Sequence, residues 1–143
     1  MTVLRRIIPL IALLTLASAC GSDSTSTAPT TSSAPYSQID LVVGTGATAN
    51  AGTTATVGYT GYLYDSSKAG GKGTAFQSGN FSFVVGVGQA IKGFDQGIVG
   101  MRVGGQRRLT IPPELAYGAN PPANSGIPVN ATLVFEITLI SVQ

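Results

Sequence analysis

The chain has 143 residues, no histidine and a single cysteine, Cys20. Nucleophilic catalysis through a Ser-His-Asp or Cys-His arrangement needs an imidazole, and a zinc site needs clustered histidines or cysteines, so we expect neither, nor any other metal or cofactor. From Cys20 onward six basic residues balance six acidic ones. A nucleic-acid partner would require a basic face, and the sequence shows none, so we expect no such partner. Any catalysis by this chain should therefore need no proton transfer.

The first twenty residues have the pattern of an export signal. Two arginines precede an apolar run from Ile7 to Leu16, which is too short to span a bilayer. The small residues before Cys20 resemble a bacterial lipobox, although Ala17-Ser18-Ala19 also fits an ordinary cleavage site. We predict a signal peptide at residues 1–19 and a lipidated Cys20. The protein would then be an exported lipoprotein, on the periplasmic or cell-surface side, that meets the membrane only through its lipid.

A polar segment follows the predicted signal. Residues 20–37 are rich in Ser, Thr and Pro and have little to bury, which predicts a disordered tether. Residues 38–143 are enough for one hydrophobic core, and we predict a single domain there, present as a monomer.

Alternating and apolar runs predict five strands in this domain, at residues 39–43, 54–64, 81–85, 106–111 and 132–142. Only one segment has helical spacing, with Ile91, Phe94, Ile98 and Met101 on one side, and neighbouring glycines predict that this helix is short. The combination predicts an α+β fold in which an antiparallel sheet buries one face by wrapping around the helix.

The connection between the last two strands is unusually long. Residues 112–130 contain five prolines, and a structureless connection of this length is uncommon unless it has a function. It also contains Tyr117 and Ile127, which are residue types that proteins prefer to bury. We predict that this loop forms one wall of an apolar pocket.

Several segments, in this order, resemble the FKBP family of peptidyl-prolyl cis-trans isomerases. They are LVVGTG from Leu41, VGYTGYLYD from Val57, FSFVVGVGQAIKGFDQGIVGMRVGGQRRLTIPPELAYG from Phe81, and IPVNATLVFEITL from Ile127. The similarity covers residues 39 to 142. It implies an FKBP-like curled sheet of five to six antiparallel strands around one short helix, with a pocket between helix and sheet. It also implies an enzyme that isomerises X-Pro bonds without a cofactor, here in exported proteins.

The resemblance further implies a set of pocket residues. The catalytic positions would be Tyr59, Phe76, Gln77, Phe94, Tyr117 and Phe135, and the substrate-binding positions would be Phe81, Ala90, Ile91 and Ile127. Phe94 would be the floor beneath the proline ring, while the Ile91 N–H and the Tyr117 hydroxyl would bond the substrate. Phe94 replaces the family's usual tryptophan and Gln77 its usual aspartate, so we expect weakened turnover.

Periodicity alone gives some of these residues a simpler interpretation. Phe81, Phe83 and Phe135 alternate on predicted strands, and Phe94 lies in the helical stripe, so all could be ordinary core. Two further hypotheses also stay open. One is a low-activity chaperone or binding module for proline-containing segments, and the other is a surface interaction protein that uses the loop at residues 65–73. The expected partners are proline-containing polypeptides and macrolides such as tacrolimus or rapamycin.

Overall fold

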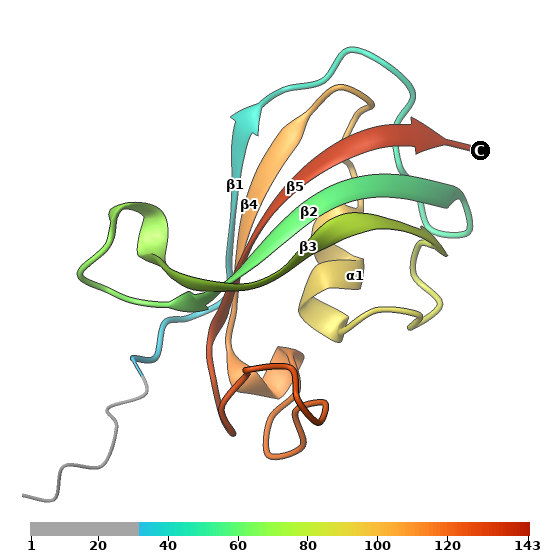
Figure 1. Cartoon of the computed structure of the whole chain (residues 1–143). Coiled ribbons are helices and arrows are strands. Elements are labelled where there is room, and N and C mark those ends of the chain that lie inside the picture. The colour runs from blue at the N-terminus through green and yellow to red at the C-terminus, as the bar shows by residue number, and fades with distance from the viewer. Residues whose placement is uncertain (1–31) are drawn as a thin grey trace, which may run out of the picture.

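Residues 32–143 form a curled antiparallel sheet with one short α-helix on its inner side (Figure 1). The structure is a computed structural model that describes residues 32–143. In chain order its elements are β1 (Ser37–Val42), β2 (Thr54–Tyr64), the 3-10 turn η1 (Ala69–Gly71), β3 (Lys72–Val84), α1 (Lys92–Ile98), β4 (Gln106–Ile111), the 3-10 turn η2 (Pro113–Leu115) and β5 (Leu133–Val142). The predicted fold class is confirmed, with five strands in the sheet.

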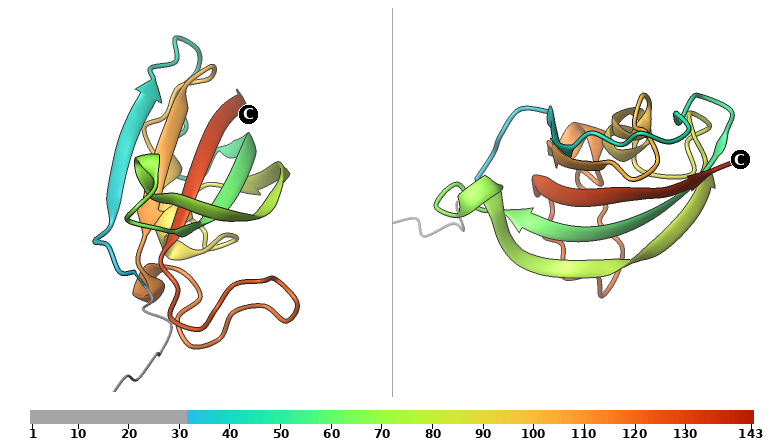
Figure 2. Two further views of the ribbon diagram at one scale, coloured as in Figure 1. Left: turned by 60° about the vertical axis from the view of Figure 1, so that its left-hand side comes forward. Right: turned by 90° about the horizontal axis from the view of Figure 1, so that it is seen from above.

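The strands are ordered β1-β4-β5-β2-β3, and every neighbouring pair is antiparallel. Alternate side chains of a strand point to opposite faces of a sheet. In the neighbouring strands β2 and β5, Val57 and Ile137 are therefore buried on the inner face, whereas Thr60 and Glu136 are partly exposed on the outer face. Seen from above, β5, β2 and β3 curve past α1, so the sheet has a distinct inside and outside (Figure 2).

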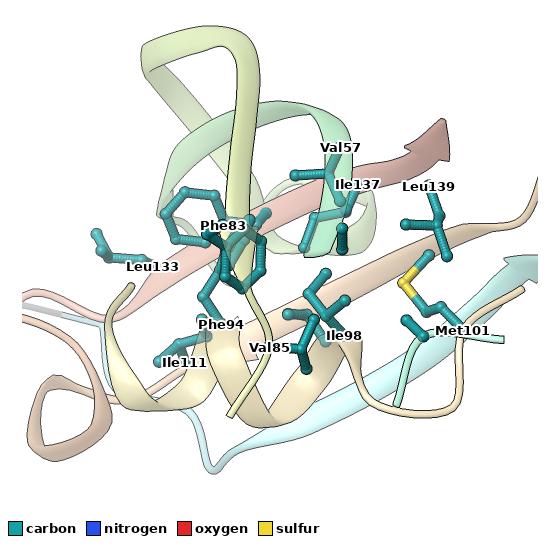
Figure 3. Close-up of a cluster of buried hydrophobic side chains, with 14 of the residues drawn as sticks. Val57, Phe83, Val85, Phe94, Ile98, Met101, Ile111, Leu133, Ile137 and Leu139 are labelled. Carbon is teal, nitrogen blue, oxygen red and sulfur yellow. The ribbon is translucent and has the colours of Figure 1, made fainter. Parts of the chain in front are cut away.

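The hydrophobic core fills the space between α1 and the inner face. Phe94 and Ile98 of α1 point toward strand residues such as Phe83 and Ile137 (Figure 3). The predicted helical stripe is confirmed for Phe94 and Ile98, which lie in α1 and are buried. Ile91 precedes the helix and is only partly buried, and Met101 is buried but follows the end of the helix. The apolar periodicity of the chain thus positions the helix against the sheet.

Contacts with the sheet hold α1 in place, because a helix of seven residues is not stable alone. Gly93 and Gly97 lie so close to β4 that a Cβ atom on either would collide with the side chains of Ile111 and Leu109. At the C-terminal end of α1, the Arg107 guanidinium donates hydrogen bonds to the carbonyls of Gly97 at 2.8 Å and Val99 at 3.2 Å. The two glycines weaken the helix by propensity, but they allow this close approach.

The N-terminal part of the described chain also contacts α1. The Tyr36 hydroxyl donates a hydrogen bond to the Gly93 carbonyl at 3.2 Å, and its ring packs against the core. Tyr36 thus packs against the core just before the predicted domain boundary at residue 38, and β1 begins at Ser37. The predicted signal peptide and Cys20 lie outside the described residues. No helix within residues 32–143 has the length and apolar character needed to cross a membrane.

β3 differs most from the sequence prediction. We predicted a strand only at residues 81–85, whereas β3 begins at Lys72 and ends at Val84. It is an edge strand that pairs only with β2, and most of its side chains are exposed. It therefore lacks the alternating apolar pattern on which the prediction relied. The polar loop predicted at residues 65–73 is correspondingly shorter and contains η1.

Candidate functional site

A pocket of about 240 Å³ lies between α1 and the inner face of the sheet. Its lining comes from β2, β3, β5, α1 and two loops, and consists of Tyr59, Gln77, Phe81, Gln89, Ala90, Ile91, Phe94, Tyr117 and Phe135. None of these side chains is an acid or a base that is charged at neutral pH. All but two of the predicted pocket residues are in this lining.

Three aromatic rings from three different elements form the base of the pocket. The ring centroids of Phe94 and Phe135 are 5.3 Å apart at 84°, and those of Tyr59 and Phe94 are 6.0 Å apart at 82°. Such edge-to-face pairs add about 0.5–1.5 kcal/mol each beyond the burial of their area. Phe94 and Phe135 are only 4% and 5% exposed, so each ring serves the core and the pocket at once.

Tyr117 enters the lining from the long connection between β4 and β5. The Asn130 N–H donates to the Gly118 carbonyl at 2.7 Å and closes the neck of this loop beside Tyr117. Burial, together with the neighbouring Tyr59 phenol, raises the pKa of Tyr117 above its ordinary value. Neither phenol hydroxyl bonds to another group within residues 32–143, so both are available to a bound molecule.

The loop between β3 and α1 provides the opposite wall. The Ile91 carbonyl accepts hydrogen bonds from the N–H groups of Phe94 and Asp95, both at 3.0 Å, and so begins the helix. The Ile91 N–H itself has no acceptor in the described part of the chain. Gln89 also lines the pocket, and its Oε1 accepts the Val84 N–H at 2.8 Å. We did not predict Gln89; its position directly before Ala90 was the only signal.

Phe76 and Ile127 were predicted in the pocket but lie outside its lining. The Phe76 ring packs edge-to-face against the Phe135 ring, with centroids 5.8 Å apart at 90°. Ile127 is 9% exposed and belongs to the core cluster. Both belong to the packing around the core, and Phe76 directly contacts Phe135, which is in the lining.

Gly61 is a further residue that shapes the pocket and that the sequence did not reveal. A Cβ atom there would lie 2.6 Å from the Phe76 ring and 2.9 Å from the Phe135 ring. Its missing side chain therefore leaves the space that both rings occupy. Gln77, opposite Gly61 in the β2–β3 register, is exposed at the pocket edge.

Residues 32–143 contain no group of three or more acidic, cysteine or histidine side chains placed to hold a metal ion.

A larger hollow of about 400 Å³ lies on the outer face of the sheet. Its lining includes Gly58, Thr60, Asn80, Gln106 and Glu136, and most of its surface is polar. Tyr59 borders it only from the strand backbone side, since its ring pairs with Phe94 and Phe135 on the inner face. The smaller pocket is the candidate functional site because it is the one built from aromatic rings and available donors.

Comparison with known proteins identifies the family. A model of the FKBP-type peptidyl-prolyl cis-trans isomerases matches residues 45–140. An FK506-binding protein of Neisseria meningitidis serogroup B is 45% identical over 108 residues, which cover 72% of this chain and 92% of the bacterial protein. The chain therefore belongs to the FKBP family of peptidyl-prolyl cis-trans isomerases.

Other relatives are longer. FK506-binding protein 4 of Gibberella zeae is 44% identical over 109 residues, which cover 73% of this chain but 20% of the fungal protein. The chain thus matches about a fifth of that relative. Among solved structures, a peptidyl-prolyl cis-trans isomerase from Pseudomonas syringae pv. tomato is 31% identical with a TM-score of 0.63, over 76% of this chain and 75% of that chain.

Proposed function

We propose that this chain accelerates cis–trans rotation of X-Pro bonds in exported polypeptides. The observation that carries the proposal is the uncharged aromatic pocket, with its unbonded Ile91 N–H and two unbonded phenol hydroxyls. Membership of the isomerase family supports it independently.

The chemistry of this rotation suits such a pocket. Amide resonance opposes rotation with a barrier of about 18–20 kcal/mol. The two isomers of an X-Pro bond are close in energy, so an enzyme needs only to speed up their exchange. Without assistance this exchange takes on the order of 10–100 s. In the twisted transition state conjugation is lost and the amide is less dipolar than when planar. Water favours the planar dipole, so a pocket that excludes water binds the twisted form better than either ground state.

Each part of the pocket has a role in this scheme. The proline ring would lie on Phe94, between Tyr59 and Phe135. The Ile91 N–H would hold a substrate carbonyl, and the Tyr117 hydroxyl would donate a second hydrogen bond. The volume of about 240 Å³ is many times the roughly 10–15 Å³ that holds one water molecule, so a five-membered ring has room.

The required energy is modest. A thousandfold acceleration needs only about 4 kcal/mol of preferential binding to the twisted amide. Because no lining residue is an acid or base near neutral pH, the reaction proceeds without proton transfer. Gln77→Asp tests whether the missing carboxylate limits turnover. A higher kcat/KM in this variant would show that Gln77 is a handicap, and an unchanged value would show that it is not.

A protease-coupled assay on a proline tetrapeptide tests the proposal directly. The purified full chain should raise the isomerisation rate in proportion to its concentration, and excess competing proline peptide should remove the effect. Absence of any rate above background, with the chain shown to be folded by circular dichroism, would contradict it. Peptide binding without turnover would instead support the alternative, a chaperone or binding module for proline-containing segments.

We also propose that the chain is exported and anchored through a lipid on Cys20. The support is the sequence pattern alone, since Cys20 lies outside the described residues. Labelling cells with a radioactive fatty acid should mark the wild-type chain and leave Cys20→Ala unlabelled. Equal labelling of both chains, or of neither, would contradict the anchor.

Two further properties belong to this proposal. Relatives carry the name FK506-binding protein, and we propose that the same pocket in this chain binds macrolides such as tacrolimus or rapamycin. Titration calorimetry should show one macrolide bound per chain, and the protease-coupled assay should show loss of isomerase activity at saturation.

We propose that the chain acts as a monomer, and light scattering should give the mass of a single chain.

A further inference from the structure

The wall between β3 and α1 has little burial of its own to hold it. Gly86 and Gly88 have positive φ angles of 85° and 79°, and both are exposed. Val87 between them is 58% exposed. Glycine loses more conformational freedom on ordering than other residues, so this segment needs specific bonds to keep one shape. It leads directly into Ala90 and Ile91, which line the pocket.

A buried carboxylate supplies these bonds. Asp95, in the first turn of α1, is only 7% exposed. Its Oδ1 accepts the Gly86 N–H at 2.6 Å and its Oδ2 accepts the Gly88 N–H at 3.0 Å. No basic side chain in residues 32–143 forms an ion pair with it. A carboxylate buried without a cation must be bonded by donors, and here the donors are alternate amides of the pocket wall.

The same residue is joined to the other end of the wall. The N–H groups of Asp95 and its neighbour Phe94 both donate to the Ile91 carbonyl at 3.0 Å. Asp95 therefore links the loop, the peptide unit of Ile91 and the helix turn that bears the pocket floor. We propose that Asp95 is a positioning residue, which holds the wall so that the Ile91 N–H points at the substrate carbonyl. This inference rests on the proposed isomerase function and adds to it a residue that does not touch the substrate.

Asp95→Asn removes one of the two acceptors while changing the side-chain volume little. The amide oxygen can replace only one carboxylate oxygen, and its NH₂ group would face the other loop N–H. We expect kcat/KM of the full chain to fall about tenfold, a change equivalent to about 1.4 kcal/mol. Asp95→Glu keeps both acceptors and should recover a large part of the activity. Asp40→Asn is the matched control, because Asp40 pairs with Arg107 outside the pocket and should keep wild-type activity.

Amide hydrogen exchange in the wild-type chain measures directly whether Asp95 protects the loop amides. This measurement requires no catalytic activity and does not depend on whether a variant folds. The Gly86 and Gly88 amides should exchange at least tenfold more slowly than that of Val87, which has no acceptor in the described residues. In Asp95→Asn that protection should be lost while protection in β2 and β5 remains. Equal exchange at all three amides, or a variant with wild-type kcat/KM, would overturn the inference. An inactive wild type would contradict the proposed function instead, and the exchange pattern would still decide whether Asp95 holds the wall.

Discussion

The two faces of the central strands carry hollows of opposite character. The inner hollow, of about 240 Å³, is bounded by rings from Tyr59, Phe94 and Phe135, whereas the outer one, of about 400 Å³, is bounded mainly by Thr, Asn, Gln and Glu side chains. The larger hollow lies over the well-solvated surface of a sheet and offers no apolar base. The character of a lining, more than its volume, therefore identifies the face able to favour a less dipolar amide.

The outer face is held together differently from the inner one. Glu136 accepts ion-pair contacts from Lys72 at 3.0 Å and Arg108 at 2.8 Å, and the Lys72 ammonium lies 5.5 Å from the Tyr62 ring centroid. These side chains are still partly exposed to water, and ion pairs at a protein surface typically contribute about 0.2–1 kcal/mol each. Substitutions on the inner face should therefore cost far more than matched substitutions on the outer face, and the following predictions test this difference.

Phe135→Ala should have the largest effect. The ring is 5% exposed and contacts three other rings, so its removal leaves a cavity as well as losing burial. We expect a loss of about 3–5 kcal/mol in the free energy of unfolding. Urea denaturation measures this loss, and kcat/KM should fall even under conditions where the variant is folded. Thr138→Ala, on the outer face of the same strand, should change stability by no more than about 0.5 kcal/mol.

Gly61 and Gly58 of β2 lie on the inner and outer faces of the sheet, so the same substitution can be compared on both faces. Gly61→Ala would drive a methyl group into the Phe76 and Phe135 rings, while in Gly58→Ala the nearest atom is Asn80 Oδ1 at 3.2 Å, on an exposed side chain. We expect Gly61→Ala to cost about 1–3 kcal/mol from overpacking. Gly58→Ala should be close to neutral, because the Asn80 side chain can move away. Equal losses in the two variants, measured by thermal unfolding, would contradict the contrast between the faces.

Tyr117→Phe should affect binding and leave the fold intact. Its hydroxyl has no hydrogen-bond partner in the described residues, so its removal breaks no bond within the folded chain. Loss of one hydrogen bond to the substrate should weaken peptide binding by about 0.5–1.5 kcal/mol, roughly twofold to tenfold. An NMR titration with a proline peptide measures the Kd. Wild-type affinity in the variant would show that this hydroxyl has no role in binding.

Acid should weaken the outer face and spare the pocket chemistry. Burial raises the pKa of Glu136, but hydrogen bonds from Arg108 and Lys72 outweigh it and leave the pKa below its ordinary value. A carboxyl with a lowered folded-state pKa stabilises the fold above its unfolded-state pKa and loses this contribution as pH falls through the folded value. We expect this loss to be about 1 kcal/mol or less below about pH 4.5. Urea denaturation against pH should show a smaller decline for Glu136→Gln.

The elements with a buried face could be predicted closely from the sequence. The predicted bounds of β2 and β4 agree with the structure, and β5 begins one residue later than predicted. These strands bury alternate residues, so burial leaves a visible period in the sequence. The first nine residues of β3 were missed, because an edge strand with both faces near solvent is not constrained to alternate.

One pocket wall was predicted from the long loop and the other pocket residues through resemblance, whereas the bonds that hold the wall between β3 and α1 were not predicted. The bonds from Asp95 to the Gly86 and Gly88 amides join a side chain to backbone groups, and such contacts leave no periodic signal. Phe76 and Ile127 were placed in the lining because their positions matched the family, but in the structure they pack with Phe135 and the core cluster and are not in the lining. Which ring faces a pocket depends on three-dimensional packing around Gly61, which the linear order does not contain.

Exchange spectroscopy on a ¹⁵N-labelled chain with a proline peptide tests the central claim most directly, since one sample reports both the reaction and its location. We predict cis–trans exchange peaks of the peptide on a sub-second scale, far faster than the unassisted 10–100 s or so. We also predict amide shifts at Ile91, Phe94 and Tyr117 and none at Thr60 or Thr138. A folded chain that leaves the peptide exchange at its unassisted rate, or that shows shifts only on the outer face, would contradict the account.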